Sequence, residues 1–183
     1  MQNRFKAAWV WLRRIGHCRG FGIQSPWAYR FVRYVVNEHS DYYAYETLTK
    51  QLPCDWMTRK MGRLFFRLAN YWQPVAVQGV ADDTLWAYLK AGCQRAERVP
   101  GTAPMPDVRR MLVVSPDDEA PQTIQPDGQT MLVVMGIGYR DAAAKLWQTL
   151  LDDQRARTTF DLYYCGIAFF ETRLYKKNYI VNF

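Results

Sequence analysis

Three short apolar runs in the second half of the chain constrain the fold more than any other feature of the sequence. They cover residues 75–78, 111–114 and 131–135, and none of them alternates between apolar and polar side chains. Strands of this kind are covered on both faces, as in a parallel sheet. Helical periodicity at residues 84–91 and 139–151 places helices between and after them. We therefore predict an α/β fold with a Rossmann-like, mostly parallel sheet.

The last part of the chain predicts strands only. Residues 158–170 form one long β segment in which Gly166 predicts a bulge or a bend, and residues 178–183 form the final strand. Without a helix to carry a parallel crossover, neighbouring strands pair antiparallel. The sheet is therefore expected to end in an antiparallel C-terminal edge.

N-terminal helices are predicted to precede the first strand. They cover residues 3–15, a second segment that Ser25 caps and Pro26 begins, ending near Asn37, and a third that Asp55 caps and that runs to about residue 72. Residues 41–53 form a loop or a short helix. The length fits a single domain, with a helical part at 1–72 and an α/β core at 73–183. We expect five large side chains of the helices to pack on this core: Trp9, Leu12, Trp27, Phe31 and Tyr34.

No segment reaches 18 uncharged apolar residues, and the apolar run at 7–12 is followed by Arg13 and Arg14 in place of a cleavage site. We expect no membrane insertion, and we expect a cytoplasmic location. No metal site is expected from the cysteines, because their spacing is too wide for zinc: they are Cys18, Cys54, Cys93 and Cys165.

Charge is concentrated near the start of the chain. Residues 1–37 hold seven cations and no acid, whereas the rest of the chain holds 17 charges of each sign. Five of the cations are candidate contacts for an anionic partner, which would be a nucleic acid, an acidic protein or a membrane surface: Arg4, Lys6, Arg13, Arg14 and Arg19. The alternative is a solvated basic face. The aromatic residues of these helices would also suit contact between two copies of the chain.

Other residue types offer no better site. His17 and His39 lie in predicted turns without a nucleophile motif beside them, so they are interpreted as surface or capping residues. The acidic clusters at 82–83 and 117–119 lie in predicted loops, where capping and solvation are the preferred interpretation over metal binding.

Several segments resemble one enzyme family. Residues 19–31 read Arg-Gly-Phe-Gly-Ile-Gln-Ser-Pro-Trp-Ala-Tyr-Arg-Phe and residues 41–45 read Asp-Tyr-Tyr-Ala-Tyr. Both resemble the lead-in of a group of bacterial class I S-adenosylmethionine-dependent methyltransferases of the O-methyltransferase type. Residues 159–170 and 177–183 resemble the end of the same group, and Ile137 and Trp147 match its intervening strand-to-helix junction. The resemblance implies a Rossmann-like sheet with a reversed final strand.

The departures from this family fall on its cofactor site. Its glycine-rich turn is reduced here to residues 78–84, where Gly79 is the one glycine. Gly79, Asp82 and Asp83 are the remnants of a cofactor site that the resemblance implies. No second strand is expected between residues 92 and 109, so Glu97 is a weak substitute for the acid that holds the ribose. Met135 and Gly136 stand where the family has an Asp pair.

The resemblance and its departures together predict a degenerate methyltransferase-fold protein that is a non-catalytic binding or interaction module. No cofactor is expected. Two alternatives stay open: an active methyltransferase with an unusual loop for S-adenosylmethionine, and a nucleic-acid-binding protein that uses the basic N-terminal helices.

Overall fold

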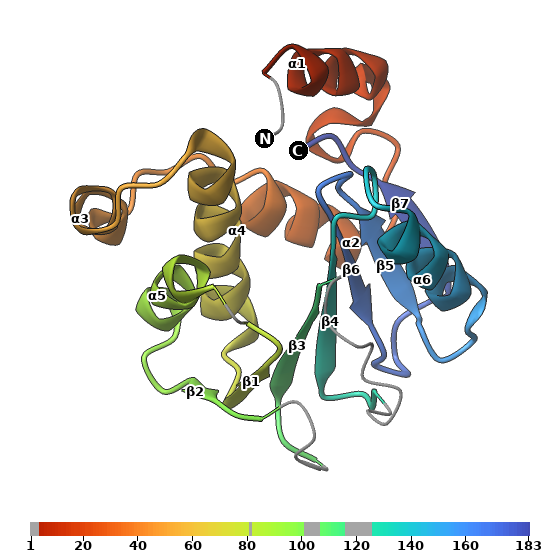
Figure 1. The fold of residues 1–183 in the computed structure, drawn as a ribbon. Helices are drawn as coiled ribbons and strands as arrows, with labels where there is room; N and C mark the ends of the chain where they lie inside the picture. Colours follow the sequence, from red (N-terminus) through yellow and green to blue (C-terminus); the bar gives the residue numbers. More distant parts are fainter. Residues whose placement is uncertain (1–3, 81, 101–106, 116–125) are drawn as a thin grey trace. The chain divides into compact units, whose positions relative to one another are not determined.

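The computed structural model describes residues 4–80, 82–100, 107–115 and 126–183, but not the side chains of Arg4, Phe5, Lys6 and Arg19. The chain divides into two compact units (Figure 1). The first consists of Met1–Tyr71, Asp82–Gln94 and Val181–Phe183, and the second of Trp72–Ala81 and Arg95–Ile180. The helical part that the sequence predicts thus gains two segments from later in the chain.

The first unit is helical. Its helices are α1 (Arg4–Arg13), the 3₁₀ helix η1 (Ile15–Gly20), α2 (Pro26–Phe31), the π-helical turn η2 (Val32–Val36), α3 (Tyr43–Gln51), α4 (Trp56–Trp72, whose last residue belongs to the second unit) and α5 (Asp83–Gly92). The predicted caps are confirmed. Ser25 Oγ accepts a hydrogen bond from the Ala28 N–H at 3.3 Å, and Asp55 Oδ1 accepts one from the Thr58 N–H at 2.7 Å.

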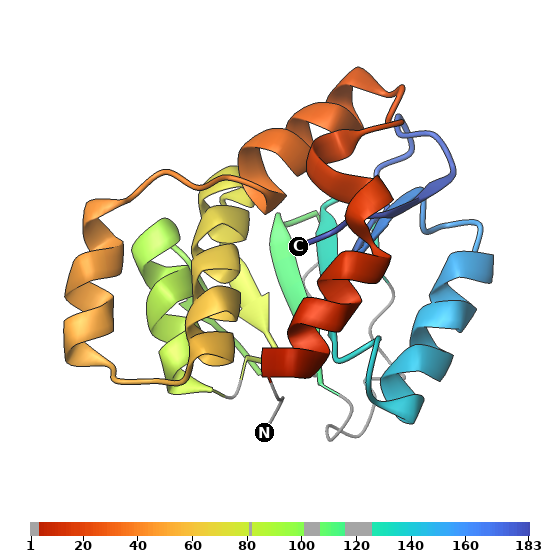
Figure 2. The ribbon, with the colours of Figure 1, turned by 90° about the horizontal axis from the view of Figure 1, so that it is seen from above.

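Helices α3, α5 and α4 lie side by side in this order (Figure 2). They are held together by an aromatic cluster in which Tyr45 of α3 contacts both Phe66 of α4 and Tyr88 of α5, with Leu48 in the same cluster. Gly92 of α5 lies so close to the main chain of Phe66 that a side chain there would meet it. Four apolar residues of α4 belong to its buried face: Met61, Leu64, Phe65 and Leu68.

The expected packing of the N-terminal aromatic stripe is only partly right. Phe31 is buried and Trp27 is half-buried, but Trp9, Leu12 and Tyr34 are exposed. Among the described side chains of α1, Val10 is the buried one. Helical periodicity predicts which side chains share a face of a helix, but it does not predict whether that face is buried.

The second unit contains a seven-stranded sheet with the order β2-β1-β3-β4-β6-β5-β7. Its strands are β1 (Ala76–Gln78), β2 (Glu97–Arg98), β3 (Arg110–Val114), β4 (Thr130–Met135), β5 (Thr158–Asp161), β6 (Cys165–Phe169) and β7 (Lys177–Ile180). All pairs are parallel except β4 with β6 and β6 with β5. This confirms the predicted mixed α/β, Rossmann-like fold. The antiparallel part comes from one reversed strand, β6, while the outermost strand β7 runs parallel to its neighbour.

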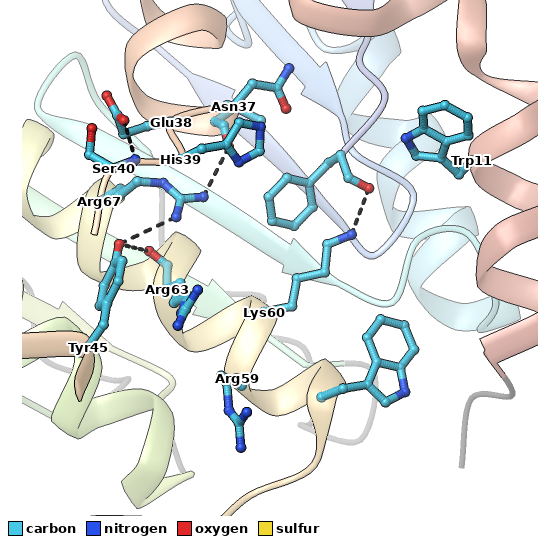
Figure 3. Close-up of a pocket in the computed structure, with 13 residues that line it drawn as sticks. Trp11, Asn37, Glu38, His39, Ser40, Tyr45, Arg59, Lys60, Arg63 and Arg67 are labelled. Atoms are coloured by element: carbon cyan, nitrogen blue, oxygen red, sulfur yellow. Dashed lines mark hydrogen bonds between the residues drawn. The ribbon is translucent and has the colours of Figure 1, made fainter. Parts of the chain in front are cut away.

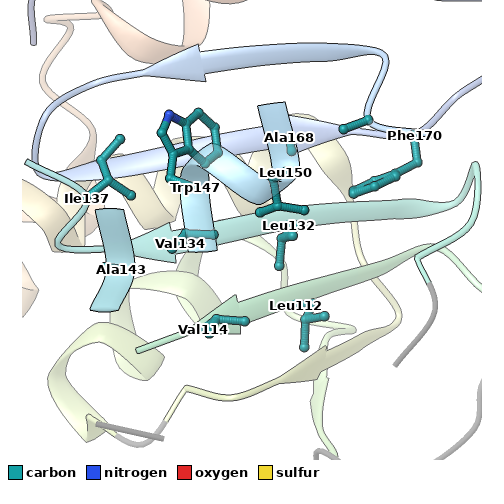
Figure 4. Packing of buried hydrophobic residues seen from close by; sticks show 11 residues of the cluster. Leu112, Val114, Leu132, Val134, Ile137, Ala143, Trp147, Leu150, Ala168 and Phe170 are labelled. Carbon is teal, nitrogen blue, oxygen red and sulfur yellow. The ribbon is translucent and has the colours of Figure 1, made fainter. Parts of the chain in front are cut away.

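Helix α6 (Asp141–Asp152) covers one face of this sheet. Trp147 of α6 packs with Val134 of β4 and Ala168 of β6 in one apolar cluster (Figure 4). The residues of β3, β4 and β6 are buried on both faces of the sheet, which is why these strands have no apolar–polar alternation.

Two details of the predicted sheet are wrong. Residues 158–170 form a hairpin, not one long strand, because the chain reverses at Leu162–Tyr164, where Tyr163 has a φ of 69° and its N–H donates to Asp161 Oδ1 at 2.8 Å. A second strand does exist, since Glu97 and Arg98 pair with Ala76 and Val77. It has two exposed residues, and a strand that short leaves no recognisable pattern in the sequence.

Candidate functional site

A cavity of about 440 Å³ lies within the first unit (Figure 3). One face of α4 forms its floor, and the segment that follows η2 forms a wall. Aromatic residues from α1, α3, α4 and the end of the chain contribute the rest. The lining residues are Trp11, Val36, Asn37, Glu38, His39, Ser40, Tyr45, Trp56, Arg59, Lys60, Arg63, Arg67 and Phe183.

Among the described side chains that line the cavity, the four cations all come from helix α4. Arg59, Arg63 and Arg67 follow each other at intervals of four residues, which places them on one face of the helix with Lys60 beside them. The apolar face of the same helix is buried in the unit. Burial of that face fixes the rotation of the helix and so points the basic face at the cavity.

Arg67 is the most firmly held of these cations. Its side chain is 7% exposed, and its Nε and Nη2 donate to the main-chain oxygens of Val35 and Val36 at 2.6 and 3.0 Å. A third hydrogen bond reaches Tyr45 Oη at 3.4 Å. The guanidinium therefore satisfies carbonyl groups at the end of η2, which fixes the wall of the cavity against its floor.

Three buried N–H donors on lining residues lack a hydrogen-bond partner within the described part of the chain. They are Nδ2 of Asn37, Nε of Arg59 and Nε of Arg63. A buried donor without a partner costs roughly 1–3 kcal/mol. The Arg63 guanidinium lies over the Tyr45 ring at 4.9 Å, and Arg59 reaches Cys54 O only at 3.5 Å. Arg59 and Arg63 are therefore held by fewer protein contacts than Arg67 among the contacts described here.

The cavity is strongly positive. Glu38 is the one acid among the lining residues that the structure describes. Hydrogen bonds from the Ser40 side chain and main chain lower the pKa of Glu38, as does the nearby Arg67, so its carboxylate is ionised at neutral pH. Lys60 already donates to the main-chain oxygen of Phe183 at 2.8 Å and lies over its ring at 4.5 Å. Four cations against one carboxylate leave an excess of positive charge.

The residues predicted as remnants of a cofactor site are not gathered in this cavity. Gly79 belongs to the second unit and has a φ of 80°, with the Val113 oxygen where a side chain would lie. Asp82 and Asp83 are exposed and belong to the first unit. Asp82 caps α5, since its Oδ1 accepts from the Leu85 N–H at 3.0 Å, and Asp83 is in the first turn.

Two of the five predicted basic contacts, Arg13 and Arg14, have described side chains, and neither lines the cavity. Arg13 is exposed and its guanidinium lies 4.5 Å from the centre of the Trp9 ring, while Arg14 is half-buried. Arg4 and Lys6 are in α1 and Arg19 is in η1, but their side chains lie outside the described part of the structure, as do all residues of the acidic cluster 117–119.

In the turn after β4, two main-chain N–H groups form hydrogen bonds within the protein. The N–H groups of Gly136 and Gly138 donate to the oxygens of Tyr164 and Tyr163 at 2.7 and 2.8 Å. The Tyr163 ring fills the space beside Gly138. At the place where the resemblance implies an Asp pair, the turn is therefore closed by the β5–β6 hairpin.

The α4 cations were missed because the charge count from residue 38 onward balances. Their four-residue spacing is the signal that places them together. His39, interpreted from the sequence as a surface residue, is exposed and lines the cavity, whereas His17 contributes its main-chain oxygen to Asn182. The described residues contain no group of three metal-ligating side chains.

Comparison with protein-family models, with curated proteins and with solved structures finds no match to this chain. Within the described residues, no helix has the length and apolar character needed to cross a bilayer.

Proposed function

We propose that this chain is a non-catalytic binding protein on a Rossmann-like fold, and that the cavity beside α4 holds a small organic anion. The observation that carries this proposal is a cavity whose described lining side chains include four cations and one carboxylate.

The chemistry of the lining residues favours a carboxylate or phosphate group. A guanidinium presents donors in a planar fork that matches either anion, and Arg59 and Arg63 are one helical turn apart. Trp11, Trp56 and Tyr45 add aromatic surface around this charge. A volume of about 440 Å³ is within the range of small-molecule sites. We therefore expect a ligand that joins an anionic group to an apolar or aromatic body.

The same considerations favour binding over methyl transfer. The resemblance to methyltransferases carries over at the ends of the chain but not at the polar groups of the cofactor site. The N–H groups of Gly136 and Gly138 donate to main-chain oxygens of the protein itself, and a carboxylate oxygen of Asp82 accepts a hydrogen bond that caps α5. Too few polar groups are then left to hold S-adenosylmethionine.

The test is calorimetric titration of the intact chain with phenyl phosphate, benzoate and inorganic phosphate. We expect saturable binding of an aromatic anion at or below about 1 mM. The variant Arg59→Gln with Arg63→Gln, which keeps side-chain bulk but removes both charges, should bind at least about tenfold more weakly. The matched control is Arg30→Gln, an exposed arginine of α2 in the same unit and outside the cavity. Failure of all three probes to bind, or equal binding by the double variant, would overturn the proposal.

A further inference from the structure

The helix α1, the 3₁₀ helix that follows it and the next residue, Phe21, expose several large apolar side chains. Trp9 is 56% exposed, Trp11 49%, Leu12 60%, Ile15 54% and Phe21 84%. Trp9 and Leu12 are three residues apart and so share one face of α1. Folded proteins rarely present contiguous apolar surface of this kind to water unless it is used for binding.

This apolar surface is anchored at its back. Asn182 is 4% exposed, and its Nδ2 donates to the Trp11 oxygen at 3.0 Å and contacts Cys18 Sγ at 3.2 Å. Its N–H donates to the His17 oxygen at 3.0 Å. Val10 packs inward. The segment is therefore held to the first unit through its main chain, while its large side chains point outward.

The apolar surface belongs to the basic first part of the chain. Residues 1–37 contain seven cations and no acid. Arg13 is exposed and stacks over the Trp9 ring at 4.5 Å, which places a guanidinium beside an exposed indole. Indole rings and long cationic side chains are the groups that favour the region between lipid headgroups and acyl chains.

We infer that α1, η1 and the residue after them, Phe21, form a surface that docks onto membranes containing anionic lipids, lying in the plane of the interface. Trp9, Leu12, Ile15 and Phe21 would enter the boundary of the acyl chains, and the cations would contact phosphate groups. Binding of this kind grows with the buried apolar area and with attraction to anionic lipid.

Other occupants fit less well. A second copy bound through the same surface would bring the basic first parts of two chains together, which like charges oppose. A nucleic acid would neutralise the cations but would leave Leu12 and Ile15 without an apolar partner, since such interfaces are polar and wet. An anionic membrane satisfies both parts of the surface.

The experiment is co-sedimentation of the intact chain with vesicles of phosphatidylcholine alone and of phosphatidylcholine mixed with phosphatidylglycerol. We expect binding to the mixed vesicles only, and a decrease between about 0.1 and 1 M salt because the Debye length falls from about 10 to 3 Å. Trp9→Ser with Leu12→Ser should weaken binding by about tenfold or more. Neither residue lines the cavity beside α4, so the anion titrations of this variant should be unchanged.

The matched control is Tyr43→Ser, which removes an aromatic side chain that is 99% exposed on α3. It should bind vesicles like the intact chain, and all variants should melt at the same temperature because the substituted side chains are exposed. The inference is overturned if the mixed vesicles do not bind the intact chain, or if the double variant binds them equally well. It is also overturned if light scattering shows that the intact chain and Tyr43→Ser are dimers, that Trp9→Ser with Leu12→Ser is a monomer, and that none of them binds vesicles. That result would identify a second copy as the occupant.

Discussion

Gly166 shows how one residue can be correctly singled out from the sequence for the wrong reason. The sequence suggested a bulge or bend there, yet Gly166 pairs regularly with Val134 and Asp161. The requirement comes from Trp147, whose ring carbons lie 2.5 Å from the place where a Cβ would be. A packing demand made by a helix residue 19 positions earlier leaves no mark on the local pattern.

We therefore expect Gly166→Ala to lower the free energy of unfolding by about 1–3 kcal/mol, the range for overpacking a tight site. Urea denaturation measures this effect. The matched control is Gly128→Ala, where the nearest heavy atom to a new Cβ is 3.7 Å away. Equal unfolding midpoints for the two variants would contradict this account of Gly166.

Asp55 makes a stability prediction that depends on pH. The hydrogen bonds from the main chain and side chain of Thr58 lower the pKa of this carboxyl below its ordinary value of 3.8. A lowered folded-state pKa gives stability that is present above the unfolded pKa and is lost as the pH falls through the folded pKa. Asp55→Ala should cost about 1 kcal/mol at pH 7. The cost should shrink below pH 3.8.

Thermal unfolding of the intact chain and of Asp55→Ala across this pH range is the measurement. Asp55→Asn is the control, because an amide oxygen still caps the helix but does not titrate. A difference between Asp55→Ala and the intact chain that stayed constant down to acid pH would exclude a role for the ionised cap.

At the scale of the element, the N-terminal helices show that periodicity predicts a helix but not which of its apolar side chains are buried. Phe31 of α2 is 1% exposed and its ring lies 5.3 Å from that of Tyr71, whereas Tyr34 of η2 is 63% exposed. Phe31→Ala should cost about 3–5 kcal/mol. Tyr34→Ala should stay within about 0.5 kcal/mol of the intact chain. Denaturant titration of both variants tests this, and a similar loss for both would mean that the two helices are packed differently.

The elements that the sequence predicted best are those with strong local signals. Ser25, Pro26 and Asp55 begin helices because their side chains or ring suit the first turn whatever surrounds them. The hairpin between β5 and β6 was merged into one strand because no glycine or proline marks its turn. Tyr163 adopts a positive φ there, which is uncommon for a residue of its size.

At the scale of the whole molecule, the candidate site was missed because the net charge of residues 38–183 is zero. Four cations of α4 line one cavity, although the 146 residues from 38 to 183 carry equal numbers of each sign. The acidic residues that balance these cations in the charge count lie elsewhere. For example, Asp153 pairs with Arg155 at 2.8 Å in the second unit. A net charge is a sum over the chain, whereas a site depends on which charges folding brings together.

The whole-molecule prediction concerns S-adenosylmethionine. Calorimetric titration of the intact chain should show no saturable binding at micromolar cofactor, because the main-chain donors of residues 136 and 138 are already used and the family's acidic groups are absent from residues 135 and 136. The aromatic anion that we propose binds beside α4 serves as the positive control. Saturable binding of the cofactor would support the alternative of an active methyltransferase.

The reversed strand β6 also has a consequence during synthesis of the chain. Strand β4 pairs on one side with β3, which precedes it, and on the other with β6, which is made only after β5. Until Phe169 and Cys165 have left the ribosome, the apolar strand Thr130–Met135 has one open edge. At ordinary rates of translation this interval lasts roughly a few seconds. Open apolar edges recruit other chains, so the nascent protein is most prone to aggregation in this interval.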